Sequence, residues 1–163
     1  MAKKKVVKTN AIRIIEQQKI SYVEHEYEWT DRHTHVSLEA KMEPPAKTFK
    51  TLVATGNKTG FLVAVIPSNR ELDLKKLAKV SGNKKVEMLA VKELEATTGY
   101  IRGGCSPVGM KKQFPTYFDQ VGATMPTMAV SAGRRGLQIE LDPQDLAKVA
   151  HATFVDIVED VMG

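Results

Sequence analysis

Lys50 is the first candidate for a functional residue, because this lysine interrupts an otherwise apolar segment. Residues 48–54 read Thr-Phe-Lys-Thr-Leu-Val-Ala, and the two-residue repeat of a strand places Lys50 on the same face as Leu52 and Ala54. An ammonium group on an apolar face is costly unless it reaches water or an anionic partner. Two interpretations stay open: its head lies in solvent, or it binds a phosphate or polarises a carbonyl.

A second candidate is the stretch Gly103-Gly104-Cys105-Ser106-Pro107. Adjacent glycines permit positive φ angles and let backbone N–H groups converge on an oxygen that gains negative charge. The stretch lacks the glycine spacing of a dinucleotide-binding loop and the Gly-Lys-Ser/Thr of a P-loop, which disfavours both. We therefore expect a shaped loop over residues 99–114, and an anion site built from Lys50, residues 103–107 and Arg134.

The remaining candidates carry weaker signals. Cys105 is the single cysteine, which excludes an internal disulfide and a thiolate-rich zinc site. One of the four histidines could activate its thiol, but a lone cysteine behind a glycine loop more commonly fills space. His33 and His35 lack a third ligand at recognisable spacing, so we expect no metal. Arg134 and Arg135 either hold RNA phosphate or are solvated turn charges.

The elements that must position these residues mix helices and strands without strict alternation. Expected strands are 20–27, 48–55, 61–66, 85–90, 127–132 and 137–141; expected helices start with Asn10 as cap, cover 73–81 and 91–97, and begin again after the Asp142 cap. Residues 30–35 read as a loop and 36–42 as one or two helical turns. This mixture predicts one α+β domain with a curved, mixed or mostly antiparallel, barrel-like sheet.

Composition limits the class of protein. The chain has 163 residues, 42% hydrophobic and 26% charged, which suits a single globular domain over 1–163, with 1–8 as a flexible basic tail. The longest apolar run, 61–66, is too short to span a membrane, and 1–8 lacks the apolar segment of a signal peptide. These features predict a cytoplasmic protein.

The net charge of +5 is unevenly spread along the chain. Residues 1–85 hold 17 lysines and arginines against 9 acidic residues, a charge of +8, whereas residues 86–163 carry −3. An anionic partner such as RNA is one explanation, and simple solubility is the other. The salt dependence of binding would separate the two.

Three segments carry a resemblance to a known family. Phe-Lys-Thr-Leu at 49–52, Thr-Gly-Tyr-Ile-Arg-Gly-Gly-Cys-Ser-Pro-Val-Gly at 98–109 and Ser-Ala-Gly-Arg-Arg-Gly-Leu-Gln-Ile-Glu-Leu at 131–141 resemble, in order and spacing, the YbaK and prolyl-tRNA synthetase-associated editing domain family. The similarity is closest to the free-standing YbaK type, the Cys-tRNA(Pro) deacylases, and runs over nearly the whole chain.

The resemblance implies a function and a mechanism. Members hydrolyse the ester that joins a wrong amino acid to tRNA(Pro), since a proline pocket rejects cysteine or alanine by only a few kcal/mol. The YbaK type is believed to use the thiol of the substrate cysteine as nucleophile, which gives a cyclic thiolactone. The implied partner is the acceptor end of tRNA(Pro), with docking on prolyl-tRNA synthetase left open, and no cofactor, membrane or DNA is implied.

The family's site residues transfer to particular positions here. Its conserved lysine falls on Lys50, which would bind the terminal adenosine phosphate or orient the ester, and its loop glycine falls on Gly103, whose amide would stabilise the oxyanion. The substrate contacts expected are Tyr27, Thr51, Gly104, Ser131 and Arg134.

Two departures from the family leave substrate choice open. Gln138 stands where some relatives carry an acidic residue, and the segment 29–45 is shorter and differently composed than in the closest relatives. Deacylation of Ala-tRNA(Pro) or another mischarged tRNA is therefore an alternative. A non-catalytic module that binds tRNA is the alternative from a different class.

Overall fold

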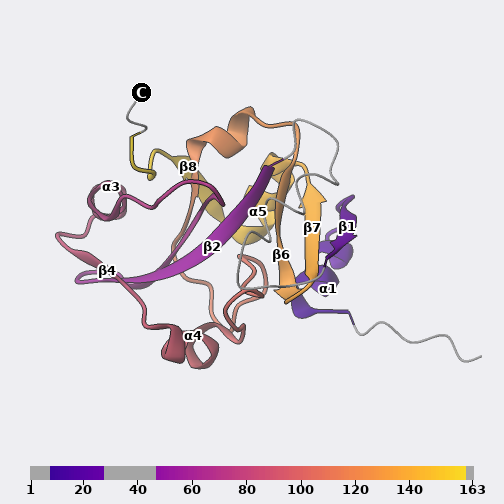
Figure 1. Ribbon diagram of the computed structural model, residues 1–163, viewed down its shortest axis with the longest axis horizontal. Coiled ribbons are helices and arrows are strands. Elements are labelled where there is room, and N and C mark those ends of the chain that lie inside the picture. The colour runs from indigo at the N-terminus through magenta and orange to yellow at the C-terminus, as the bar shows by residue number, and fades with distance from the viewer. Residues whose placement is uncertain (1–7, 28–46, 161–163) are drawn as a thin grey trace, which may run out of the picture.

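The computed structural model describes residues 8–27 and 47–160 (Figure 1). Its helices are α1 (Asn10–Gln17), α3 (Leu74–Ser81), α4 (Val91–Thr98) and α5 (Pro143–Ala150), with the 3₁₀ turn η1 (Gln120–Thr124). Its strands are β1 (Val23–Glu26), β2 (Lys47–Gly56), β3 (Gly60–Pro67), β4 (Val86–Met88), β5 (Thr116–Asp119), β6 (Met128–Arg134), β7 (Leu137–Leu141) and β8 (Ala152–Val155).

The strands form one mixed sheet around the long strand β2. Their order is β1-β7-β6-β2-β3-β5-β8, and β4 pairs with the far end of β2. The pairs β1–β7, β7–β6, β2–β3 and β2–β4 are antiparallel, whereas β2–β6, β3–β5 and β5–β8 are parallel. Figure 1 shows β2 crossing the middle of the molecule, between β4 on one side and β6, β7 and α1 on the other. The predicted α+β class with a mixed sheet is confirmed.

Apolar side chains cover both faces of β2. Phe49 and Val53 pack into the larger core cluster, which includes residues of α1, α5, β6 and β7. Leu52 and Ala54 pack on the opposite side, in a smaller cluster with α3. The predicted alternation is therefore correct, and Lys50 lies on the face of β2 that carries Leu52 and Ala54.

Helix ends follow local side-chain chemistry, with two corrections. Asp142 caps α5 as expected, and Asp73, expected inside the helix, is instead the cap of α3; each carboxylate accepts two backbone N–H bonds at the helix start. The cap of α1, however, is Thr9, whose hydroxyl accepts from the Ile12 amide at 3.2 Å. Asn10 is the first helical residue, and its side-chain amide donates to the Gly109 carbonyl at 2.8 Å.

Strands β5 and β8 were missed by the sequence analysis. Each has only four residues, too few for a clear periodic pattern, and each exists because the edge of β3 offers partners: β5 pairs with β3 and β8 with β5. The first strand is also shorter than expected, since only 23–26 pair with β7, and in the segment 85–90 the strand covers only 86–88.

Some predictions fall on parts of the chain outside the described residues. They are the loop at 30–35 with His33 and His35, the helical turns at 36–42, and residues 1–7 of the basic tail. Lys8, the last residue assigned to that tail, is held at 2.5 Å by Glu16 on α1. Within 8–27 and 47–160, no helix is long and apolar enough to cross a membrane.

Candidate functional site

Neighbouring strands carry polar side chains on one face of the sheet, opposite the larger core cluster. Ser131 on β6 pairs with Gln138 on β7, and Gln138 pairs in turn with His25 on β1. The parallel register of β2 and β6 sets Thr48 opposite Ala129. Lys50 and Ser131 each follow two residues further along their strands, so both side chains point to the same face as that pair. Paired residues point to the same side, so Lys50, Ser131, Gln138 and His25 lie on one face of the sheet, on four strands, and we call them the polar row.

The polar row is largely shielded from solvent. Ser131 and Gln138 are 8% and 9% exposed, and Lys50 is half-buried. The Lys50 ammonium makes no ion pair with any described residue. A half-buried cation that pairs with none of the described acidic residues is suited to an anionic or strongly polar ligand.

Tyr27 and Gln138 are joined at one end of β7. The Tyr27 amide donates to the Gly136 carbonyl at 3.0 Å, which continues β1 past its last paired residue. Burial raises the pKa of Tyr27, while hydrogen bonds from the Gly136 backbone and the Gln138 side chain act in the opposite direction. The Gln138 Oε1 atom is buried without a partner, so the bond to the phenol comes from Nε2. Within the described residues this acceptor is unused, and an acceptor of this kind suits a ligand that donates a hydrogen bond.

The diglycine bend packs against the tip of the β6–β7 hairpin. Gly103 has φ +84°, the left-handed conformation expected of it. A β-carbon on Gly104 would lie 2.9 Å from the Arg134 Cα, and Arg135 Nε donates to the Arg102 carbonyl at 2.8 Å. Strand β6 therefore pairs with β2, the strand that carries Lys50, and has the bend against its other end.

One predicted site residue, Thr51, lies on the opposite face of β2 from Lys50. It follows Lys50 directly, so the pleat turns it to the other face of β2, with Phe49 and Val53. Its Oγ1 atom is buried and finds no hydrogen-bond partner there. Tyr27, Ser131, Gly104 and Arg134, in contrast, all lie along β6, β7 or the residues that contact them.

Cys105 fills space behind the diglycine bend, as the more common role of a lone cysteine suggests. It is 6% exposed and packs in the larger core cluster with Tyr100 and Val108. Burial raises the pKa of its thiol to about 12, against a smaller opposite effect of the hydrogen bond with Thr98. A thiol that stays protonated at neutral pH and is out of contact with solvent does not act as a nucleophile.

A pair of residues at the β1 end of the polar row was not among the predicted site residues. His25 Nε2 lies 2.7 Å from Glu140 Oε1, and Thr127 Oγ1 lies 2.5 Å from Glu140 Oε2. The only available signal was the alternation of 23–27, which puts His25 on the same face as Tyr27. In the described part of the chain, no group of three or more histidine, cysteine or acidic side chains could hold a metal ion.

Fold and site together define a class: a small α+β domain whose mixed sheet carries a lysine and neutral polar groups on a shielded face, next to a glycine bend. The model of the aminoacyl-tRNA editing domain family matches residues 31–149. A protein of Enterococcus faecalis named "Putative Cys-tRNA(Pro)/Cys-tRNA(Cys) deacylase EbsC" is 57% identical over 162 residues, which covers 96% of this chain and 98% of that protein. The chain therefore belongs to the aminoacyl-tRNA editing domain family, and the resemblance seen in its motifs is confirmed.

Solved structures show the same fold at lower identity. A crystal structure described as "a putative trans-editing enzyme for prolyl tRNA synthetase" superposes with a TM-score of 0.79 at 22% identity, covering 95% of this chain and 100% of that one. A hypothetical protein superposes with a TM-score of 0.81 at 20% identity, over 93% of this chain and 100% of its own.

Proposed function

We propose that this protein is a trans-editing aminoacyl-tRNA deacylase that releases cysteine from mischarged Cys-tRNA(Pro). Family membership and 57% identity to a protein named as a deacylase of Cys-tRNA(Pro) and Cys-tRNA(Cys) support the reaction class and the substrate. The observation that carries the proposal is the position of Lys50 on the polar row, beside the strand whose end contacts the diglycine bend.

The arrangement suits attack by the substrate's own thiol. The sulfur of the cysteinyl group attacks the ester carbonyl, the C–O3′ bond breaks, and a cyclic thiolactone leaves the tRNA. Lys50 binds the phosphate of the terminal adenosine or orients the ester, and the Gly103 N–H donates to the oxygen that becomes negative. Ser131 and Tyr27 supply hydroxyl groups for the ribose or the amino acid. No protein nucleophile is needed, which agrees with the burial of Cys105.

The partner proposed is the acceptor end of tRNA(Pro), met in the cytoplasm by the protein alone or docked on prolyl-tRNA synthetase. The charge of +8 in residues 1–85 favours an RNA backbone. The whole chain is proposed to act as one editing domain.

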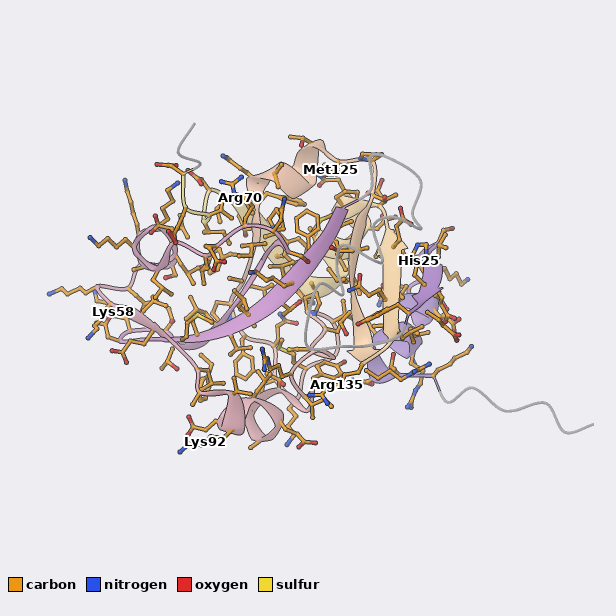
Figure 2. The ribbon with its side chains drawn as sticks, in the orientation of Figure 1. His25, Lys58, Arg70, Lys92, Met125 and Arg135 are labelled. Carbon is orange, nitrogen blue, oxygen red and sulfur yellow. The ribbon has the colours of Figure 1, made fainter. Side chains whose placement is uncertain are left out.

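The test is a deacylation panel with Cys-, Ala- and Ser-tRNA(Pro), run with and without prolyl-tRNA synthetase. Wild type is expected to release cysteine faster than the other amino acids, and Lys50→Ala to lower that rate by about 100-fold. Lys92→Ala is the matched control, because Lys92 is an exposed lysine that projects outward from α4 (Figure 2). Its rate should equal that of wild type.

Three outcomes contradict the proposal in different ways. Cys-tRNA(Pro) that stays as stable as in buffer, with and without the synthetase, rules out the enzyme. Salt-dependent tRNA binding without any release supports a non-catalytic module instead. Release of alanine or serine as fast as cysteine excludes self-attack by the thiol and leaves a deacylase of broader range.

A further inference from the structure

The pair His25–Glu140 lies at the β1 end of the polar row and has the geometry of a catalytic dyad. Its distance is 2.7 Å, and the side chains are only 18% and 14% exposed. Thr127 holds the other carboxylate oxygen at 2.5 Å. Both Glu140 oxygens are thus engaged, and the contact fixes the ring of His25 on β1 against a side chain of β7, at the right of Figure 2.

The hydrogen bonds determine which ring nitrogen of His25 can accept a proton from a substrate. An ionised carboxylate only accepts hydrogen bonds, so Nε2 carries the proton that it donates to Glu140. The neutral ring then has its lone pair on Nδ1, which has no hydrogen bond to any described residue. A carboxylate that orients one ring nitrogen while the other faces a reacting group is the arrangement of histidine bases in hydrolases.

The strand register places this base beside the proposed substrate site. His25 is the cross-strand partner of Gln138, and Gln138 is the partner of Ser131. Neighbouring strands are about 5 Å apart, so the His25 and Ser131 backbones are separated by about 10 Å. A cysteinyl ester that lies over Ser131 and Gln138 comes within reach of the imidazole.

We propose that His25, oriented by Glu140, is the general base that deprotonates the thiol of the substrate cysteine; this step rests on the function proposed above. The thiol proton moves to Nδ1 as sulfur bonds to the carbonyl carbon. When the C–O3′ bond breaks, the same proton passes from the imidazolium to the ribose oxygen. The products are the thiolactone and tRNA with a free 3′ hydroxyl, and His25 returns to its neutral state. Glu140 and Thr127 act as positioning residues.

Few titratable groups of the described sheet face His25. Glu140 faces it from β7, Tyr27 lies two residues away on β1, and Lys50 lies at the opposite end of the polar row. Glu24 and Glu26 point to the other face, since they pair with the core residues Ile139 and Leu137. Among the residues that the structure describes, Glu140 is therefore the one carboxylate that contacts the ring.

The experiment is a pH profile of single-turnover release of cysteine from Cys-tRNA(Pro). Wild type is expected to lose activity as the pH falls through the range of pH 5 to 8 in which histidines take up a proton. His25→Gln is expected to be about 100-fold slower at pH 6.5, because general bases contribute at least that much. At pH 9 the rate of His25→Gln should be only a few-fold below that of wild type, because a substrate thiol of ordinary pKa ionises there without a base.

The controls separate a chemical from a structural role. His151→Asn changes an exposed histidine with φ +55° that ends α5, and asparagine tolerates this conformation, so its profile should match that of wild type. Added imidazole should restore part of the rate to His25→Ala at pH 7.

A His25→Gln rate equal to wild type at pH 6.5 would overturn the inference and leave the proposed function intact. If wild type itself releases no cysteine, the result contradicts the proposed function, on which the role of His25 rests. If His25 variants do not fold, the wild-type profile decides: a rate without any ionisation between pH 5 and 8 contradicts a histidine base.

Discussion

The backbone of Arg134 occupies the space where a side chain of residue 104 would begin. An ideal β-carbon on Gly104 lies 2.9 Å from both the Cα and the carbonyl carbon of Arg134, and equally close to the Arg135 nitrogen. These are backbone atoms of a hairpin, which cannot rotate away as a flexible side chain does. Glycine at 104 is therefore required for the bend and the hairpin to touch.

Gly104→Ala is expected to push the bend away from β6, lower the free energy of unfolding by about 1–3 kcal/mol and slow deacylation. Urea unfolding and single-turnover release measure the two effects. Gly60→Ala is the control: Gly60 has φ +73° and open space around it, so alanine there adds backbone strain of about 1 kcal/mol without touching the site. Equal deacylation rates in the two variants would contradict a role for this contact.

The buried side chain of Gln138 is expected to lower the stability of the fold and to contribute to substrate binding. Its buried Oε1 has no partner, while its amide group holds Tyr27. Gln138→Met removes the buried, unpaired oxygen, which stabilises the fold, and the hydrogen bond to Tyr27, whose loss destabilises it. Because these two effects oppose each other, we expect the free energy of unfolding to change by less than about 1 kcal/mol. Cysteine release should fall strongly. Gln144→Met, on the exposed side of α5, should leave activity unchanged, and a fully active Gln138→Met would remove Gln138 from the site.

Cys105→Ala is expected to keep the deacylation rate, because the buried thiol is not the nucleophile. Its stability should fall by about 1 kcal/mol through lost packing. In wild type, a thiol reagent should react with Cys105 only after urea unfolds the chain. Rapid labelling of the folded protein, accompanied by loss of activity, would contradict this assignment.

The raised pKa of Cys105 also predicts sensitivity to alkali. The pKa of the thiol is about 12 in the folded protein and about 9 in an exposed chain. Its contribution to stability is fully present below pH 9 and is lost as the pH rises toward 12, because the unfolded chain releases the proton first. Stability between pH 9 and 10.5, measured with urea, should fall less steeply for Cys105→Ala than for wild type. Parallel curves would show that Cys105 does not contribute.

Asn83 ties α3 to the β2–β3 turn, far from the polar row. Its Oδ1 accepts from the Lys58 and Thr59 amides at 2.8 and 3.0 Å, and its Nδ2 donates to Thr59 and Ser81. Figure 2 shows Lys58 at the left edge of the molecule and His25 at the right. Asn83→Ala should lower the free energy of unfolding by about 2–3 kcal/mol without changing kcat below the unfolding temperature. A large fall in kcat would mean that the two ends of β2 are coupled.

Local sequence signals were sufficient for much of the fold. The period-two pattern of 48–54 placed Lys50 opposite Phe49 and Val53, and aspartates at 73 and 142 marked two helix starts. Three motifs in register identified the family. These features are encoded by neighbours within a few positions, or by residue types that a function requires in fixed order.

Only the tertiary structure decided which polar residues lie together on one face of the sheet. His25 and Glu140 are 115 positions apart, and their contact depends on the antiparallel register of β1 on β7. Thr51 matched the family pattern as well as Lys50 did, yet the pleat of β2 turns the two side chains to opposite faces. Strand pairing depends on contacts between distant segments, so no single segment determines it, and it alone puts Lys50, Ser131, Gln138 and His25 on one face of the sheet.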